Sequence, residues 1–255
     1  MVTRAVLRRL AERRRRADRR YAARLLASTA VAAVAAVLFA LLLVLVEGQW
    51  RPLRQIDVGA ARRLHELAVH HPAWTDVLHV LSDRVWDPVT LRAAVAVLTL
   101  WLLRRGAWRL AAWAAVTAVA GGLIGLLVKV VVERARPALQ DPVAQAPGYS
   151  FPSGHAMTGM TSFAVFVLVL LPLIPRAWRV ACWCVAVLSV LGVGFTRVAL
   201  GVHWFSDVLG GWLLGLAVAA LTTWAFEAWR TEAGRGRVPV GEGLEPELAE
   251  AAPER

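Results

Sequence analysis

The chain has 255 residues, of which 58% are hydrophobic and only 18% are charged, and its mean hydropathy is +0.55. This composition excludes an ordinary soluble domain, in which about 25% of residues are charged. The formal net charge of +11 could indicate a nucleic-acid-binding protein, but ten arginines gather in residues 1–24, directly before an apolar stretch. Because no nucleic-acid-binding module accompanies them, the arginines indicate a cytoplasmic segment beside anionic membrane lipids, and nucleic acid is not an expected partner.

Six apolar stretches follow along the chain, and each is predicted to be a membrane-spanning helix. The first, residues 25–46, carries no charge and is long enough to cross a hydrocarbon core of about 30 Å, so we expect a retained span and not a cleaved signal peptide. Between the first and second spans, the polar segment 47–88 predicts one or two short helices at the membrane surface. The remaining spans are predicted at residues 88–105, 108–132, 155–171, 178–196 and 204–226.

The fold class predicted is therefore all-α, a polytopic membrane protein with six transmembrane helices. We divide it into a basic cytoplasmic segment (1–24), a membrane domain (25–229) and a tail rich in Gly, Glu and Pro that is expected to be disordered (230–255). Six spans place both termini on one side, and that side then holds nineteen of the Lys and Arg residues against ten on the other. The positive-inside rule predicts cytoplasmic termini in a plasma membrane, so the loop between the third and fourth spans faces outward.

Two pairs of glycines four residues apart mark places where helices can approach closely. Gly121 and Gly125 lie in the third span, and Gly211 and Gly215 lie in the sixth. We expect these pairs to pack helices inside one bundle. A homodimer is the alternative.

Cations lie at the end of the third span, on the outward side, where the charge bias does not place them. Lys129 and Arg136 are seven residues apart, about two helical turns, so they share a face if the helix continues. Each one alone could be a side chain that snorkels to the interface. Their common side favours an anion-binding role.

The stretch SFPSGHAMTG (150–159) supplies donors at the start of the fourth span. Ser153 and Gly154 stand where the helix begins, so free backbone N–H groups and the positive helix end can face an anion. Gly154 also lets the backbone come close to a ligand. Without His155, which we expect to be buried at the mouth of the span, a simple loop-to-helix turn would explain the stretch equally well.

The stretch TRVALGVHWFSD (196–207) holds a histidine and a carboxylate one helical turn apart. Asp207 can accept the Nδ1–H of His203 and leave its Nε2 unprotonated, ready to attack. Such a pair can also be an ordinary contact on a helix surface. Arg197 ends the fifth span and adds a third cation on the same side of the membrane.

Together these residues predict phosphoryl transfer to water. Three cations and helix-end donors suit a tetrahedral dianion, and two histidines suit an in-line displacement, one as nucleophile and one as acid. No acidic cluster for Mg²⁺ and no Gly-rich nucleotide loop is evident, so we expect no metal and no cofactor. Neither a disulfide nor a metal site is predicted for Cys182 and Cys184. No metal site is expected either at the four histidines of the 47–88 segment, which are His65, His70, His71 and His79.

The stretches KVVVERARP, PSGH and TRVALGVHWFSD resemble the three signature motifs of the type 2 phosphatidic acid phosphatase superfamily of membrane lipid phosphatases. The resemblance implies a helical bundle of that type and a phosphohistidine intermediate on His203. It also implies Asp207 as the partner of His203 and His155 as general acid. One departure is Thr196, where the family usually has Ser. The phosphate-binding residues that the resemblance implies are Lys129, Arg136, Ser153, Gly154 and Arg197.

The expected function is removal of a phosphate from a lipid at the extracytoplasmic face. An isoprenoid diphosphate such as undecaprenyl diphosphate is favoured. Phosphatidylglycerophosphate and phosphatidic acid are alternative substrates, and a lipid phosphotransferase is an alternative enzyme. A transporter or scaffold that only binds lipid phosphate is the non-enzymatic alternative, although binding alone would need no nucleophile.

Overall fold

The computed structural model describes residues 4–232, and within that range it contains helices and no strand. The prediction of an all-α fold is thereby confirmed. From Arg4 on, the basic N-terminal segment is the first part of α1, whereas residues 233–255 of the predicted tail lie outside the described range. The elements are α1 (Arg4–Glu47), α2 (Arg51–His70), α3 (Pro72–Val80), a π-helical turn η1 (Leu81–Val85), α4 (Pro88–Arg104), α5 (Trp108–Val132), α6 (Gly154–Leu170), a 3₁₀ turn η2 (Leu171–Leu173), α7 (Arg176–Ala199) and α8 (Phe205–Glu232).

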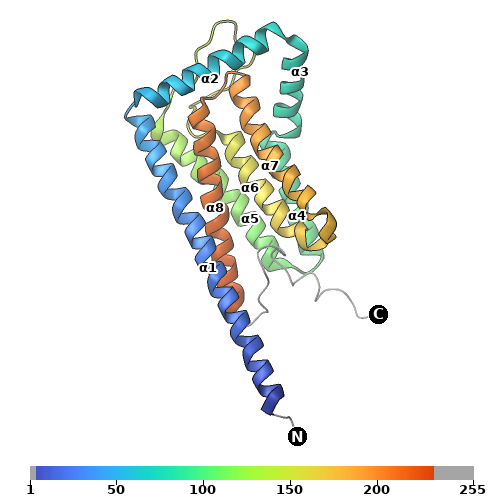
Figure 1. Ribbon diagram of the computed structural model, residues 1–255. Helices are drawn as coiled ribbons and strands as arrows, with labels where there is room; N and C mark the ends of the chain where they lie inside the picture. The colour runs from blue at the N-terminus through green and yellow to red at the C-terminus, as the bar shows by residue number, and fades with distance from the viewer. Residues whose placement is uncertain (1–3, 233–255) are drawn as a thin grey trace.

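Six helical stretches are long and apolar enough to cross a membrane, so the chain is a multi-pass membrane protein. They form a bundle, and α2 lies across one end of it, at the top of Figure 1. The helical N-terminal end of α1 and the C-terminal end of α8 both lie toward the opposite end (Figure 1). The stretches are Leu26–Glu47, Pro72–Arg104, Trp108–Val132, Gly154–Leu173, Arg176–Ala199 and Phe205–Trp229.

The second span is longer than the sequence suggested. Only α2 of the segment 47–88 crosses the end of the bundle, while α3 and η1 run on into α4 as one span. The expected surface segment up to residue 88, which was based on its prolines and four histidines, is therefore not separate from the second span, because α3, η1 and α4 form one candidate span. Pro88 instead occupies the first turn of α4, where its missing N–H costs nothing, and Asp87 caps that helix by accepting from Val89 N at 2.7 Å.

The glycine pairs pack helices within the bundle, as predicted. A Cβ on Gly121 would meet the Thr161 side chain of α6 at 3.0 Å, and one on Gly211 would meet the Ser153 carbonyl oxygen at 2.6 Å. Gly125 and Gly215 are equally close to α6. These contacts let α5 and α8 lie directly against α6, which is the most enclosed of the six spans.

Two helix ends place the loop 133–153 at the α2 end of the bundle. Glu133 ends α5 in the left-handed conformation, with φ 50°, and turns the chain out of the helix. At the other end of the loop, Ser153 caps α6 by accepting from Ala156 N at 3.4 Å. The Ser153 N–H donates to the Asp207 carbonyl oxygen of α8 at 2.9 Å, so the start of α6 is fixed to the first turn of α8.

Candidate active site

The three sequence motifs meet at the α2 end of the bundle. Lys129 comes from the last turns of α5, Arg136 from the loop, His155 from the first turn of α6, and Arg197 from the last turn of α7. His203 lies in the short turn between α7 and α8, one helical turn before Asp207.

His203 is held at both ring nitrogens. Its Nδ1 lies 3.3 Å from Asp207 Oδ2, and its Nε2 lies 3.1 Å from the Arg136 guanidinium. Because a carboxylate only accepts, the bonded proton sits on Nδ1, and Nε2 keeps a lone pair that faces the Arg136 cation. Burial lowers the pKa of His203 to about 4, although the hydrogen bond to Asp207 opposes that shift. The side chain is 2% exposed, so the ring is neutral and rigidly placed at neutral pH.

Asp207 is fully buried and saturated with donors. Its carboxylate accepts from the Trp204 backbone N–H at 2.8 Å, from the Ser150 hydroxyl, and from the Arg134 guanidinium at 2.5 Å. A buried carboxylate with several donors is both charged and fixed in orientation. It therefore holds His203 in one tautomer and one position.

A second buried carboxylate supports the first from the helix that covers this end. Asp57 of α2 is 1% exposed and binds the other side of the Arg134 guanidinium at 2.8 Å. It also accepts from the backbone N–H and hydroxyl of Ser206 at 2.8 and 2.6 Å. The sequence reasoning did not find Arg134 or Asp57. The available signal was an acidic residue on a helix that carries more basic than acidic side chains.

Lys129 and Arg136 donate to neutral carbonyl groups of the loop and of the turn between α7 and α8. Lys129 Nζ donates to the Tyr149 carbonyl oxygen at 2.6 Å, and Arg136 donates to the Gly148 and Val202 carbonyl oxygens at 2.9 and 2.7 Å. Burial lowers the pKa of Arg136, and Asp207 opposes this shift. No carboxylate of the described residues lies within ion-pair distance of either cation, so their charge is available to a bound anion.

The start of α6 presents a different environment. The hydroxyl of Ser153 is buried and serves as the helix cap, while a Cβ added to Gly154 would meet nothing within 4 Å. His155 is half-buried, which corrects the prediction that it is buried, because its first helical turn borders a cavity. Within the described part of the chain its ring makes no hydrogen bond.

Arg197 is buried, but its guanidinium is turned toward η1. It donates to the Ser82 hydroxyl at 2.6 Å and lies 3.5 Å from the Asp83 carboxylate. The second span, which the sequence reasoning left partly at the surface, therefore positions this cation. Thr196 is the residue that departs from the family pattern. Its hydroxyl donates to the Val193 carbonyl oxygen of its own helix at 2.8 Å.

One histidine of α2 and one of α3 hydrogen-bond to the loop between α5 and α6. His65 Nε2 lies 2.7 Å from the Gln140 carbonyl oxygen, and His79 Nε2 lies 3.0 Å from that of Val143. The residues described here contain no group of three or more His, Cys, Asp or Glu that could hold a metal ion. Cys182 and Cys184 are free.

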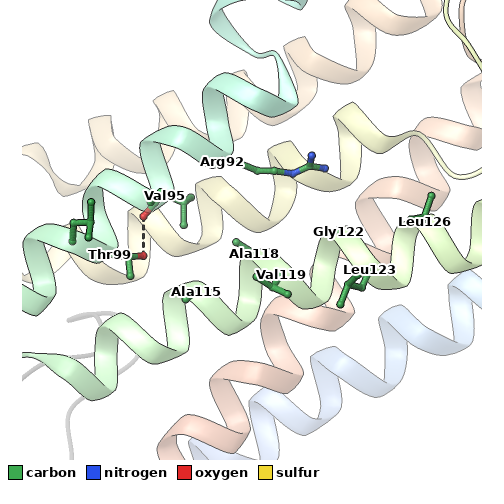
Figure 2. Close-up of a pocket in the computed structure, with 11 residues that line it drawn as sticks. Arg92, Val95, Thr99, Ala115, Ala118, Val119, Gly122, Leu123 and Leu126 are labelled. Carbon is green, nitrogen blue, oxygen red and sulfur yellow. Dashed lines mark hydrogen bonds between the residues drawn. The ribbon is translucent and has the colours of Figure 1, made fainter.

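Two cavities lead away from this cluster. A cavity of 150 Å³ lies between α4, α5 and α6 and is lined by Lys129, Gly154 and Thr158 among others. A larger groove of 740 Å³ lies between α4 and α5 and is lined mainly by apolar residues, such as Val119 and Leu123 (Figure 2). Arg92 of α4 lines both.

The fold and the site define a class: a multi-pass helical membrane protein with a His–Asp pair surrounded by cations at one end of its bundle. Residues 109–231 match the family model of the PAP2 superfamily. These residues contain all three motifs, so the match confirms the resemblance to that superfamily which the motifs carry.

Two curated relatives show the same relationship. Phosphatidylglycerophosphatase B of Bacillus subtilis (strain 168) is 38% identical over 97 residues, which are 37% of this chain and 47% of that protein. Undecaprenyl-diphosphatase of Sulfolobus acidocaldarius is 30% identical over 147 residues, which are 55% of this chain and 63% of that protein. The chain thus spans about half to under two thirds of the length of these relatives.

One solved structure shares the fold. The crystal structure of a transmembrane PAP2-type phosphatidylglycerolphosphate phosphatase from Bacillus subtilis matches with a TM-score of 0.68 and 22% identity. The match covers 75% of this chain and 94% of that one. The predicted helical bundle of this type is therefore confirmed.

Proposed function

We propose that this protein is an integral membrane lipid phosphatase that works through a phosphohistidine on His203. The observation that carries the proposal is the state of that ring: Nδ1 bound to Asp207 and Nε2 directed at Arg136. A neutral imidazole whose unprotonated Nε2 lies beside a cation is arranged to attack the phosphorus of an anion that the cation binds. A protein that only bound phosphate would not need this arrangement, which argues against the transporter or scaffold alternative.

The reaction has two steps. In the first, Nε2 of His203 attacks phosphorus, the bond to the leaving oxygen breaks, and His155 as general acid gives that oxygen a proton. In the second, water attacks the phosphohistidine, His155 takes a proton from the water, and inorganic phosphate is released. The anionic oxygens would be met by Lys129, Arg136 and Arg197, and by the Ser153 and Gly154 groups at the start of α6.

The substrate we favour is an isoprenoid diphosphate such as undecaprenyl diphosphate. A relative bearing the name undecaprenyl-diphosphatase supports this choice. Another relative is named phosphatidylglycerophosphatase B, so phosphatidylglycerophosphate is the second candidate, and phosphatidic acid would fit the same pocket. A phosphotransferase would use the same phosphohistidine with an acceptor other than water.

The reaction is proposed to need no divalent metal, because cationic side chains of the site supply the positive charge that a metal would otherwise provide. The site is proposed to face the extracytoplasmic side of the plasma membrane, on the basis of the positive-inside count. The basic N-terminal segment would then contact anionic lipids of the cytoplasmic leaflet.

One assay tests the reaction and its metal requirement together. Purified protein in detergent is given lipid monophosphates and diphosphates, with water as the sole acceptor, in the presence of a chelator. We expect phosphate release that the chelator does not reduce. Release that appears only after Mg²⁺ is restored would contradict the metal-independent mechanism.

Labelling tests the orientation. A cysteine placed between Gln140 and Gln145, in a variant lacking the two native cysteines, is expected to react with an impermeant thiol reagent added to intact cells. Labelling that requires lysis would place the site on the cytoplasmic side.

A further inference from the structure

Arg92 is a cation that neither the phosphate-binding set nor the His–Asp network uses. It lies in the second turn of α4, inside a candidate membrane span. Its guanidinium donates to the Thr158 hydroxyl of α6 at 3.2 Å. Figure 2 shows the side chain extending from α4 toward α6.

The partner of Arg92 is neutral. Among the described residues no carboxylate lies within ion-pair distance of it, in contrast to Arg134 and Arg197. An arginine that snorkels would reach the membrane surface, whereas this one reaches across to a neighbouring helix. An uncompensated guanidinium held between helices of a membrane protein indicates an anionic ligand.

The position of Arg92 specifies where that anion would be. The groove between α4 and α5 is lined by methyl and methylene groups, which suits a hydrocarbon chain. The 150 Å³ cavity holds Lys129 and the start of α6, which belong to the catalytic site. Arg92 lines both spaces, and its partner Thr158 lies one helical turn after His155 on α6. It therefore stands between the place for a lipid tail and the place where phosphorus reacts.

We propose that Arg92 binds the phosphate next to the lipid tail and thereby makes the site selective for a lipid diphosphate. The tail would occupy the groove, the first phosphate would bind Arg92, and the terminal phosphate would be attacked by His203. This inference rests on the proposed function and specifies its substrate class. Because Lys129, Arg136 and Arg197 already match one phosphate, a fourth cation on the tail side suits a second one.

Arg92 would also stabilise the leaving group. When the bond from the terminal phosphorus to the bridging oxygen breaks, the electron pair goes to that oxygen, and the lipid monophosphate leaves with the proton from His155. The hydrogen bond from the Arg92 guanidinium to this phosphate strengthens as the negative charge on the phosphate grows. A lipid monophosphate substrate has no such group, so it would gain nothing from Arg92.

The test compares Arg92→Ala with Arg104→Ala, a control at the other end of α4. Farnesyl diphosphate and farnesyl monophosphate serve as matched substrates, and an aryl phosphate reports that the catalytic site is intact. A charged hydrogen bond is worth about 1.5–3 kcal/mol, so kcat/KM of Arg92→Ala for the diphosphate should fall about 10- to 100-fold. Its activity on the monophosphate and the aryl phosphate should change less than about threefold. Thr158→Val, which removes only the hydroxyl that orients Arg92, should show a smaller loss with the same selectivity.

Equal losses on the diphosphate and the monophosphate would overturn the proposal, and so would no loss on either. A binding measurement separates this result from a failure of the proposed function. Farnesyl methylenediphosphonate, which cannot be hydrolysed at its bridge, should bind Arg92→Ala at least about tenfold more weakly than the parent protein, whereas farnesyl phosphonate should bind both alike. If the two proteins differ in affinity in this way but the parent protein shows no turnover, the phosphatase proposal fails and the Arg92 site stands. Equal affinity of the diphosphonate for both proteins would refute the site.

Discussion

The two histidines of the site lie in contrasting surroundings. His203 has both ring nitrogens engaged, and its partner Asp207 is held by donors from the loop, from its own turn and, through Arg134, from α2. His155 is half-buried, makes no hydrogen bond within the described residues, and lies at the start of a helix beside open space. One half of the site is complete without a ligand, and the other half is open.

The difference matches the two chemical tasks. A nucleophile must be neutral and oriented before the substrate arrives. A dense network of buried hydrogen bonds fixes its position in this way. A general acid must reach the leaving oxygen of a bound lipid, and open space beside it admits that lipid. The cavities on the His155 side, bordered by Arg92 and Lys129, are consistent with a substrate that completes this half.

Replacing His203 should have the largest effect. His203→Ala removes the atom that forms the covalent bond, so turnover should fall by at least roughly 10⁴-fold for every substrate. No acid-labile phosphoenzyme should form with radiolabelled lipid or aryl phosphate. A phosphoenzyme that persists in this variant would show that another residue is the nucleophile.

Replacing His155 should reduce turnover of lipid substrates but not abolish phosphoenzyme formation from an aryl phosphate. His155→Ala should lower lipid turnover by about 10²- to 10⁴-fold, because the leaving alkoxide or phosphate loses its proton donor. An aryl phosphate needs less of this help, so the variant should still form phosphoenzyme with that substrate. Loss of the phosphoenzyme in His155→Ala, with its retention in His203→Ala, would reverse the two roles.

Weakening the support from α2 should have an intermediate effect. Asp57→Asn keeps the size of the side chain but loses the charge that holds Arg134, so Asp207 and His203 become less well placed. Displacement of a catalytic group by about 1 Å can cost 10²-fold, so we expect kcat to fall about 10- to 100-fold with little change in KM.

Asp76→Asn, at an exposed position of α3, is the matched control for that variant and should behave as the parent. Thermal unfolding in detergent separates misfolding from misplacement. A folded Asp57→Asn protein with unchanged kcat would show that Asp207 does not depend on α2.

Local sequence patterns predicted much of the site, but they did not predict its contacts between residues far apart in the chain. The His203–Asp207 pair is four residues apart on a helix, and the structure places the ring and carboxylate in contact as the spacing predicted. The Arg134–Asp57 pair joins residues 77 positions apart, and Arg92 meets Thr158 across 66 positions. Helical periodicity contains no information about such contacts, because they depend on how α2 and α4 are placed against the bundle.

The error in the second span has a related cause. Polar residues of α3 and η1 indicated a surface segment, but Asp83 lies within reach of His79 at 2.8 Å and of Arg197 at 3.5 Å. Charges that pair can be accommodated within a span, and the pairing again depends on a distant helix. Hydropathy alone therefore placed the other spans more accurately than this one.

The smallest predicted effect concerns pH and again separates the two histidines. Burial lowers the pKa of His203 from 6.5 to about 4, with the hydrogen bond and charge of Asp207 opposing the shift and the charges of Arg136 and Arg197 adding to it. At pH 5 only about a tenth of the nucleophile should be protonated, so its charge state should change little between pH 7 and pH 5. In the unfolded chain the same ring gains its proton near pH 6.5, so this residue's contribution to the free energy of unfolding should decrease as the pH falls from about 6.5 toward 4. Nitrogen NMR of ¹⁵N-histidine-labelled protein in detergent, with His203→Ala for assignment, should show a His203 ring protonated on Nδ1 alone down to about pH 5. A midpoint near 6.5 would mean that water reaches the ring, and the nucleophile would then be no more enclosed than the acid.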